Sequence, residues 1–437
     1  MSKFSTFPPL SLAYIAAVTP SNWEVKIADE NFDQFQFEEA DLVGITAFTS
    51  SINRAYEIAR MYRERKIKVV LGGIHASMLP DEALEYADAV VVGEVEGIWE
   101  KVINDFEDNA LALKYVGPQI DLSQFRISAR RDLLHPDYYW HSVQTSRGCP
   151  FNCNFCSVTK YLGKAYRQRK AKDVLDELKT ITGDYIFFLD DNLIGYSPKS
   201  KDRGRELFEG MAELGLSKKW LMQTSINAAD DVQLVQLAAQ AGCMYVFVGF
   251  EAISEEILKG MKKGANLNIG VENYQKVVDT FHKYGIAVWG AFIIGNDYES
   301  AEYYEQLAGF LLDSGIDIVQ ITTLTPLPGT QLMEQVQKER RLIFHDFPED
   351  WSKYRFSYMV HQPQGVSVDT IYIGNNYIKN RIYSFPTYQY RIVKSLYTLK
   401  NFTNFYASYK ANQAYKRGWQ NSHYYKKYPF NFSSIDT

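Results

Sequence analysis

Two successive series of short apolar runs, each run followed by a segment with helical spacing, constrain the fold of this 437-residue chain most strongly. Strands of a parallel sheet are buried on both faces, so they form short runs rich in Val, Ile and Leu. Helices between consecutive strands supply the crossovers that a parallel sheet needs. The chain is also longer than one hydrophobic core usually supports. The sequence therefore predicts an α/β protein with two or three domains.

The first series occupies residues 1–108 and predicts an open, Rossmann-like α/β domain. Its helix candidates include residues 51–65, which carry a charged outer face. In an open sheet of this kind the ligand lies at the carboxyl ends of the strands. The strands are predicted at residues 23–29, 42–48, 68–73 and 89–93.

The second series occupies residues 140–335 and contains six strand–helix units, which predict a partial, TIM-like (β/α)6 barrel. Chemistry in such barrels gathers at the C-terminal ends of the strands. Residues 109–139 between the two series are predicted to be a linker laid over the barrel mouth. The strands are predicted at residues 142–146, 185–189, 220–224, 245–250, 287–294 and 317–324, and the helices at 171–180, 204–214, 231–241, 269–284 and 300–314.

Three of the four cysteines lie within eight residues, at Cys149, Cys153 and Cys156. A [4Fe–4S] cluster usually takes four cysteines, so three thiolates would leave one iron open to an outside ligand. Zinc normally takes four protein ligands, or three and a water, and disulfides need an oxidising compartment and would leave one thiol over. Cys243 begins a predicted buried strand, where a cysteine serves as a small apolar residue. The spacing therefore favours an iron–sulfur cluster with one open iron.

The cysteine motif resembles the signature of the radical S-adenosylmethionine (SAM) superfamily. The resemblance implies that the amino and carboxylate groups of SAM bind the open iron. An electron from the cluster then breaks the sulfonium C–S bond, and a 5'-deoxyadenosyl radical takes hydrogen from a substrate. It further implies that residues 140–335 are the radical SAM barrel and that a flavodoxin- or ferredoxin-type protein donates the electron.

The same resemblance implies SAM contacts near the cysteines and at the ends of later strands. Phe155 stands where the family sets an aromatic side chain against the adenine. Asp190 and Asp191 follow the second strand, where an acidic segment holds the ammonium group of SAM; capping of the next turn is the alternative. Glu251 closes the fourth strand in a segment similar to a Gly-x-Glu-Ser element and would bind the ribose hydroxyls.

Further contacts are implied at the third and fifth strands. Ser225 and Asn227 suit the ribose or the methionine carboxylate, with a helix N-cap as the alternative role. Ile293 and Gly295 match the element whose backbone meets the adenine edge, an approach that glycine permits. No catalytic acid or base is assigned.

Three arginines, Arg147, Arg167 and Arg169, flank the cysteine loop in the sequence. They are expected to balance the charge of the cluster or to hold an anionic substrate. Residues 325–330, after the sixth strand, are expected to shape the substrate mouth.

Residues 1–108 look like the cobalamin (B12)-binding-type domain that precedes many radical SAM barrels. The resemblance rests on residues 8–16, on the Gly72-Gly73-Ile74-His75-Ala76-Ser77 segment and on Gly93-Glu94-Val95-Glu96. We expect the opening strand of that domain to be missing, and no Asp-x-His-x-x-Gly segment supplies a histidine to cobalt. His75 either lines the pocket or is structural.

Together the resemblances imply an enzyme that uses a [4Fe–4S] cluster, SAM and cobalamin to methylate an unactivated carbon of a small molecule or lipid. One SAM would supply the radical and a second would remethylate the cobalamin, while the protein positions both cofactors and excludes water. A cyclisation, rearrangement or C–C bond formation without cobalamin is the first alternative. A nucleic-acid-modifying or nucleic-acid-binding protein is the second.

Residues 336–437 are predicted to be mainly helical, basic and aromatic. From residue 371 onward, ten Lys or Arg stand against one acidic residue, Asp436, although the whole chain has a net charge of −5. Packing on the barrel with a solvated basic face is the first interpretation, peripheral contact with an anionic membrane the second and nucleic-acid binding the third. With no apolar run of about 20 residues and no export signal, we expect a cytoplasmic protein.

Overall fold

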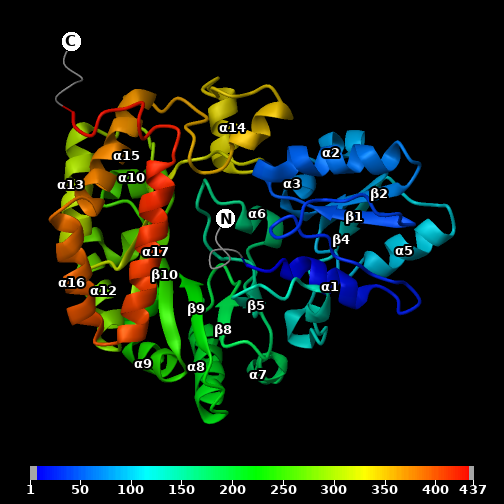
Figure 1. Ribbon diagram of the computed structural model, residues 1–437, viewed down its shortest axis with the longest axis horizontal. Coiled ribbons are helices and arrows are strands. Elements are labelled where there is room, and N and C mark those ends of the chain that lie inside the picture. Colours follow the sequence, from blue (N-terminus) through cyan, green and yellow to red (C-terminus); the bar gives the residue numbers. More distant parts are fainter. Residues whose placement is uncertain (1–6, 433–437) are drawn as a thin grey trace.

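A four-stranded parallel sheet forms the core of the N-terminal domain in the computed structural model, which describes residues 7–432 (Figure 1). Its order is β1-β2-β3-β4, and helices pack on its faces. The strands are β1 (Leu42–Thr46), β2 (Lys68–Gly72), β3 (Ala89–Gly93) and β4 (Lys114–Gly117). The helices are α1 (Leu10–Val18), α2 (Ile52–Arg63), α3 (Gly73–Met78), α4 (Pro80–Tyr86) and α5 (Trp99–Glu107).

Two predictions for this domain are wrong. Residues 23–29 form no strand, because their alternating side chains rest on the domain while their backbone finds no neighbouring strand to pair with. Conversely, β4 lies within residues 109–139, which were expected to be linker throughout, and it pairs with β3. Only Tyr115 of this strand is buried, so the run carries too little apolar signal to be recognised.

Six parallel strands form the partial barrel, in the order β12-β11-β10-β9-β8-β5. The α/β fold with this barrel is confirmed. The strands are β5 (His141–Val143), β8 (Tyr185–Phe188), β9 (Lys219–Thr224), β10 (Cys243–Glu251), β11 (Ala287–Ile294) and β12 (Ile318–Thr323). The helices between them are α7 (Ala171–Thr180), α8 (Pro198–Glu213), α9 (Val232–Gln240), α10 (Glu255–Gly260), α11 (Gly264–Ile269), α12 (Tyr274–Lys283) and α13 (Ala301–Asp313).

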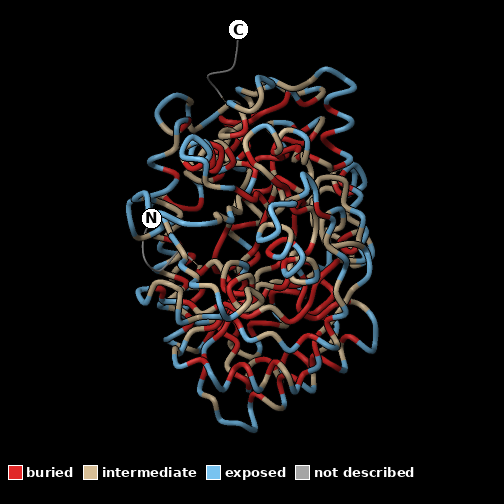
Figure 2. The backbone as a smooth tube through the Cα atoms, turned by 90° about the vertical axis from the view of Figure 1, so that its right-hand side faces the viewer, coloured by how far each residue is buried: buried red, intermediate tan, exposed pale blue. Residues whose placement is uncertain are grey.

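The first barrel strand is shorter than predicted. It ends at Val143, and the chain then forms β6 (Ser146–Arg147), which pairs antiparallel with β7 (Arg167–Gln168) around α6 (Val158–Leu162). Helix α8 begins six residues earlier than predicted, because Ser197 caps it and Pro198 occupies its first turn. Buried residues, red in Figure 2, concentrate in the interior of the molecule, and exposed residues, pale blue, lie along its periphery.

The C-terminal region is mainly helical, as predicted, and contacts both domains. It contains α14 (Gln331–Lys338), α15 (Val368–Tyr383), α16 (Thr387–Leu399) and α17 (Phe402–Gln420). Helix α15 packs on α13, and α17 covers the edge strand β12, which would otherwise expose unpaired backbone groups. Between α14 and α15, Trp351 and Tyr354 join the hydrophobic core of the N-terminal domain. No helix within residues 7–432 has the length and apolar content to cross a bilayer.

Candidate functional site

The cysteine loop lies at the C-terminal end of the first barrel strand, between β6 and α6. Its base is closed by the β6–β7 pair, and the Cys149 N–H donates to the Gly163 carbonyl at 3.2 Å. Its tip is bound to later parts of the barrel. The Asn154 N–H donates to Met261, and the Asn154 carbonyl accepts from Leu332. The loop is therefore fixed at both ends over the strand ends of the barrel.

The three thiols of this loop are partly buried and share one electrostatic environment. Burial raises the pKa of all three, that of Cys156 to about 12. Asp191 adds to the rise at Cys149 and Cys156, whereas Lys263 opposes it at all three. Cys243 is fully enclosed at the start of β10, away from this group, which agrees with its predicted structural role.

Lys263 is the main site residue that the sequence did not reveal. Its Nζ donates to Glu251 at 2.5 Å and lies 6.0 Å from the centre of the Phe155 ring. Burial alone would lower the pKa of Lys263, but Glu251 and the thiols raise it, so this side chain is a cation. It follows α10 in the chain, about a dozen residues past the strand end, and only the folded structure brings it to the cysteines.

Glu251 is held in an unusual backbone conformation at the end of β10. Its φ is 63°, and the register between β10 and β11 shifts between Gly249 and Glu251. Asn266 stabilises this bend by donating to the carbonyls of Gly249 and Phe250 at 3.0 and 2.9 Å. A non-glycine residue in the left-handed region costs free energy and is typical of functional sites. The bend turns the Glu251 carboxylate toward Lys263 and the cysteine loop.

The two aspartates after β8 have different environments. Asp190 is completely buried, and its carboxylate accepts from the Thr145 N–H at 3.1 Å, from the Thr145 hydroxyl at 3.0 Å and from Ser146. These contacts tie β8 to the start of the cysteine loop, so they indicate a structural role in place of the predicted ligand contact. Asp191 is open to water, yet burial, together with the charge of Asp190, raises its pKa to about 6. Unlike Asp190, Asp191 is therefore accessible to a ligand.

Asn192, which the sequence did not single out, organises the neighbouring strand ends. Its amide donates to the Ser225 hydroxyl at 3.0 Å, and its carbonyl oxygen accepts from Thr224 and from the Gly195 N–H, both at 3.2 Å. Asn227 is buried and donates to the Gly195 carbonyl, while its own side-chain oxygen has no protein partner. Neither Ser225 nor Asn227 caps a helix, because the side chain of Asp231 caps α9.

The predicted adenine contacts divide between two environments. Phe155 and Ile293 belong to one apolar cluster beside the cysteine loop. Gly295 has a φ of 91°, and a Cβ on it would lie 2.7 Å from the Met359 thioether. The close approach that this glycine permits is therefore that of Met359, from the C-terminal region.

The arginines near the cysteine loop are already paired, which corrects the expectation that they face the cluster or a substrate. Arg147 donates to Glu94 at 3.0 Å and to Glu96 at 2.5 Å, and Arg167 also pairs with Glu94. Arg169 is buried in an ion pair with Glu177, within the barrel.

The pairs of Arg147 and Arg167 join the two domains at one particular edge of each. Glu94 and Glu96 follow β3, at the carboxyl end of the N-terminal sheet, and the arginines flank the cysteine loop at the carboxyl ends of the barrel strands. Gly329, in the loop after β12, also packs closely against Met78 of α3. Both edges are the ones where parallel sheets bind ligands, and here they face each other.

His75 lies at the same edge of the N-terminal sheet but is fully buried. Its Nδ1 is 3.2 Å from the Thr49 hydroxyl, and its Nε2 is 3.1 Å from Glu82. Glu82 also accepts from Trp351, at 3.0 Å. Because both ring nitrogens are engaged, His75 has the structural role of the two that were considered.

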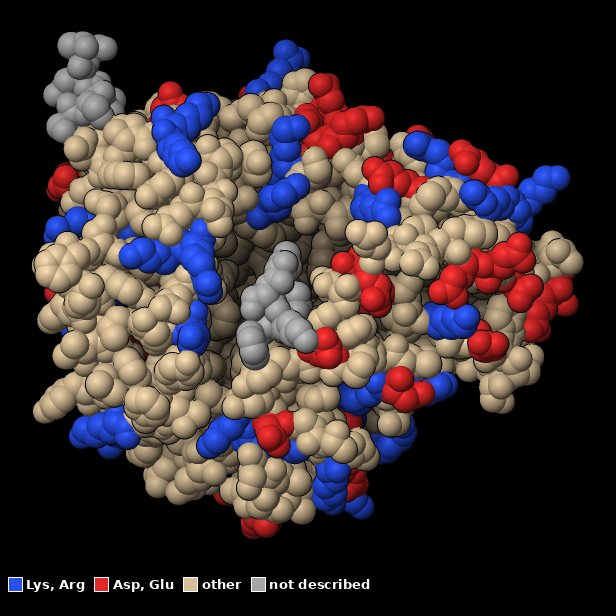
Figure 3. Space-filling model, viewed as in Figure 1, with Lys and Arg blue, Asp and Glu red and all other residues tan. Residues whose placement is uncertain are grey.

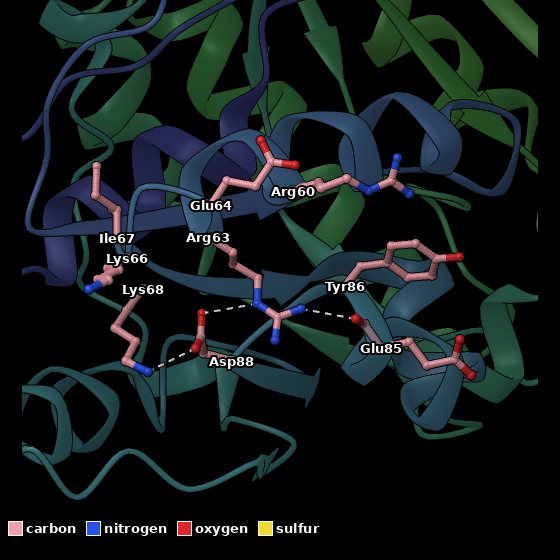
Figure 4. A pocket seen from close by; sticks show the side chains of 9 residues that line it. All are labelled: Arg60, Arg63, Glu64, Lys66, Ile67, Lys68, Glu85, Tyr86 and Asp88. Carbon is pink, nitrogen blue, oxygen red and sulfur yellow. Dashed lines mark hydrogen bonds and ion pairs between the residues drawn. The ribbon is translucent and has the colours of Figure 1, made fainter.

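A surface depression of about 760 Å³ on the N-terminal domain, shown in Figure 4, is lined by none of these residues. It surrounds the start of β2, at the opposite edge of the N-terminal sheet. Its charges largely satisfy one another, since Asp88 pairs with Lys68 at 2.9 Å and with Arg63 at 3.6 Å. It is an open groove between ion pairs and has none of the features of the cysteine site.

Within residues 7–432, no three Cys, His, Asp or Glu side chains converge closely enough to hold a single metal ion. A [4Fe–4S] cluster makes a different demand, because each cysteine binds its own iron. Three thiols on one anchored loop, beside the Lys263 cation, fit a cluster that carries negative charge.

Comparisons with known proteins agree with this arrangement. The family model of the B12 binding domain matches residues 4–103, and that of the radical SAM superfamily matches residues 143–311. Bacteriochlorophyllide d C-12(1)-methyltransferase of Chlorobaculum tepidum is 30% identical over 85% of this chain and 81% of its own. Hopanoid C-2 methylase of Rhodopseudomonas palustris is 28% identical over 78% of this chain and 66% of its own.

Two solved structures share the fold. The radical SAM methyltransferase TsrM of Kitasatospora setae, with tryptophan and a SAM analogue, has a TM-score of 0.66 and 18% identity, over 77% of this chain and 74% of its own. The cobalamin-dependent enzyme OxsB also has a TM-score of 0.66, at 16% identity, over 86% of this chain and 63% of its own.

The two matched families imply the cofactors: a radical SAM domain uses a [4Fe–4S] cluster and SAM, and a B12-binding domain binds cobalamin. Given its two matched domains and a relative that is 30% identical over most of both chains, the chain belongs to the radical SAM superfamily, in the group whose barrel follows a B12-binding domain.

Proposed function

We propose that this protein is a cobalamin-dependent radical SAM methyltransferase that methylates a carbon atom of a small molecule. The observation that carries the proposal is the apposition of the two ligand-binding edges through Arg147, Arg167, Glu94 and Glu96. A cobalamin on the first edge and a SAM on the second would meet in one enclosed space. Two relatives named for methylation, at C-12(1) and at C-2, support this choice over a rearrangement without cobalamin.

In this proposal Cys149, Cys153 and Cys156 hold the [4Fe–4S] cluster. Their raised pKa values oppose the thiolate form that a metal needs, so Lys263 assists by stabilising negative charge beside all three. When bound, the cluster and SAM supply a radical that removes hydrogen from the substrate carbon, and cobalamin supplies the methyl group that replaces it.

The remaining contacts orient SAM. Asp191, exposed and ionised above a pH of about 6, accepts a hydrogen bond from the methionine ammonium group. Glu251, fixed by its bent backbone and by Lys263, faces the ribose, and Phe155 and Ile293 flank the adenine. Ser225 and Asn227 contribute polar contacts from β9, whereas Asp190 and Gly295 act by fixing the loops around the site.

On the N-terminal side, the edge that follows β2 and β3 receives the cobalamin. Gly73 and Gly93, with φ of 89° and 85°, form tight turns at the ends of β2 and β3, on this edge of the sheet. His75 does not serve as a cobalt ligand, because both of its nitrogens bond within the protein. A flavodoxin- or ferredoxin-type donor supplies the electron, in the reducing cytoplasm that an exposed cluster requires.

The experiment that tests this function starts from the chain reconstituted anaerobically with iron, sulfide and hydroxocobalamin. We expect corrinoid absorbance to remain with the protein after gel filtration. Dithionite and SAM should then yield 5'-deoxyadenosine in the wild type and none in Cys153→Ala. Reconstituted protein that forms 5'-deoxyadenosine but retains no corrinoid would support the cobalamin-independent alternative.

A further inference from the structure

Helices α16 and α17 expose an unusual number of apolar side chains. Of the 17 exposed large hydrophobic side chains found among residues 7–432, six lie between residues 390 and 406. We define these six as the outer face: Tyr390, Val393, Leu396, Tyr397, Phe402 and Tyr406. Tyr397 is 79% and Phe402 71% exposed. Scattered apolar residues are normal on a protein surface, but a contiguous group on one helical hairpin marks an interaction site.

The side of α16 that faces the barrel carries two buried polar residues, Arg391 and Ser395, beside the buried Leu399. Arg391 is buried and donates to the carbonyls of Ile382 and Ile316 at 3.3 and 3.2 Å. Ser395, one turn later, is also buried and donates to Asp317 at 2.6 Å. Tyr390, Val393 and Tyr397 lie on the opposite side of the same helix.

Helix α17 repeats the pattern. Asn404, Ser408 and Asn412, spaced four residues apart, are buried against the barrel. Asn404 donates to the Gly285 carbonyl at 2.8 Å, and Asn412 donates to the Asp317 carbonyl at 2.6 Å. These two helices thus dock on the barrel through buried hydrogen bonds together with apolar contacts from residues such as Leu399 and Tyr415, and they also expose aromatic and aliphatic side chains on their outer side.

All charged residues of α16 and α17 are basic. Lys400 and Lys410 are exposed beside the outer face, and the Nζ of Lys410 lies 5.4 Å from the centre of the Tyr406 ring. Between residues 370 and 435 the sequence contains no Asp or Glu. In Figure 3, blue side chains separated by broad tan areas lie over this side of the molecule, and red ones gather over the N-terminal domain.

We propose that the outer face of α16 and α17 docks on an anionic lipid surface, with its aromatic side chains in the headgroup layer. Tyrosine and lysine are suited to that layer, because each has an apolar body and a polar end. Lys400 and Lys410 would meet lipid phosphates, which attract them from about a Debye length away. A second copy of the chain would instead bring the same positive charges together across a twofold axis. The aliphatic side chains of Val393 and Leu396 offer a nucleic acid neither a charge for its phosphates nor a ring on which its bases could stack.

The test is flotation of the full-length, cluster-loaded protein with vesicles of phosphatidylcholine, alone or mixed with phosphatidylglycerol. We expect binding only to the mixed vesicles and its release by high salt. The triple variant Tyr390→Ser/Val393→Ser/Tyr397→Ser should bind about tenfold less, and Lys400→Glu/Lys410→Glu should bind less by a similar factor.

Matched controls keep a folding defect apart from a loss of docking. Leu214→Ser/Val232→Ser removes exposed apolar side chains at α8 and α9, and Lys199→Glu/Lys219→Glu makes the same charge change there. Both should bind as the wild type does, and all four variants should keep the wild-type melting temperature and 5'-deoxyadenosine formation. Equal binding of the triple variant and the wild type would overturn the proposal. So would a dimer, seen by sedimentation, that the triple variant abolishes, or competition by single-stranded RNA in place of lipid.

Discussion

The carboxylate of Asp191, unlike that of Asp190, is not engaged by neighbouring side chains within residues 7–432, and this difference determines the role that we propose for it. The Asp190 carboxylate accepts hydrogen bonds from Thr145 and Ser146, whereas Asp191 is exposed and has a pKa raised by burial and by the charge of Asp190. At neutral pH it is a carboxylate in an unfavourable setting, which a cation would relieve. This explains why two adjacent residues of one type have different roles.

Asp191→Asn should weaken SAM binding to the reconstituted protein at pH 7.5 by about tenfold or more, the loss of one charge-assisted hydrogen bond. In the wild type, affinity should fall as the pH drops through about 6, because protonated Asp191 no longer attracts the ammonium group. The variant should show no such step. Calorimetric titration across this pH range measures both effects.

A second readout concerns the stability of the folded chain. A carboxyl group whose folded pKa lies above its unfolded value of about 3.9 destabilises the fold as the pH rises between the two values. Asp191→Asn should therefore melt at a higher temperature than the wild type, by a margin that grows up to a pH of about 6 and is constant above it. An unchanged margin from pH 4 to 7 would contradict the environment described for Asp191.

Lys263 is predicted to matter for cluster assembly. Lys263→Gln removes the cation that lowers the pKa of all three thiols, so fewer thiolates are present near neutral pH. We expect less iron per chain after reconstitution at pH 7, and recovery toward the wild-type value at pH 9. Lys262→Gln is the matched control, because that neighbouring lysine is exposed and bonds to Gln331. Equal iron contents in both variants at pH 7 would remove Lys263 from the site.

At the residue scale, the sequence motifs predicted candidate site residues that follow strands, and the structure places the three cysteines, Asp191 and Glu251 after or at the carboxyl ends of barrel strands. The sequence could not identify Lys263, Asn192 or Trp351, because their partners lie far away in the chain and no local pattern records the contact. The expectation that Arg147 and Arg167 balance the charge of the cluster or hold an anionic substrate is not met, because both pair with Glu94. The position of a charged residue near a motif in the sequence does not show which oppositely charged residue the fold will bring beside it.

The element that positions the chemistry is the cysteine loop with its β6–β7 base. Gly148 begins the loop with a φ of 87°, and a Cβ there would lie 2.2 Å from the Ala165 carbonyl oxygen. That backbone oxygen cannot move without breaking the strand pair beside it. Glycine is therefore required at this position for two reasons: its φ is positive, and a side chain would collide with the Ala165 carbonyl oxygen.

Gly148→Ala should displace the loop and lower iron retention severalfold, with a loss of stability of about 2 kcal/mol or more. Gly215→Ala is the control: φ is 57° there, but nothing lies within 4 Å of its Cβ, so only the conformational cost of about 1 kcal/mol applies. Iron analysis and thermal melting separate the two. Equal iron retention would mean that the loop tolerates a different path.

Elements with a continuous apolar run or a full helical period were predictable, and α7 and β11 have the predicted bounds. The failures were the segments whose structure depends on a partner. In residues 23–29 half-buried and exposed side chains alternate as in a strand, but no other strand of the described chain pairs with this segment. β4 has only one buried residue, yet it forms because it pairs with β3. Strand pairing is a property of two segments, so one segment alone does not determine it.

The whole molecule depends on the ion pairs that join its two domains. Glu94 accepts from both Arg147 and Arg167, and all three side chains are largely buried. Burial alone would raise the pKa of Glu94, but the hydrogen bond from Arg167 and the charge of Arg147 lower it. Removing this one carboxylate leaves two buried cations short of a partner.

Glu94→Gln should reduce the free energy of unfolding by roughly 3 kcal/mol, measured by urea denaturation at pH 7. The lowered folded pKa stabilises the protein above the unfolded value of about 4.3 and is lost as the pH falls through the folded value. The gap between wild type and variant should therefore close in acid. Asp132→Asn, which removes an exposed pair with Arg130, should cost at most about 1 kcal/mol. A similar loss in both variants would contradict the structural role of Glu94.

Trp351 extends this connection in a way that affects the behaviour of the entire chain. It comes from the C-terminal region, yet it packs in the N-terminal core and donates to Glu82. The N-terminal domain is thus held in two ways, directly to the barrel by the ion pairs of Glu94 and to the C-terminal region by Trp351. Any motion that separates the cobalamin side from the SAM side about a single hinge would have to break both sets of contacts.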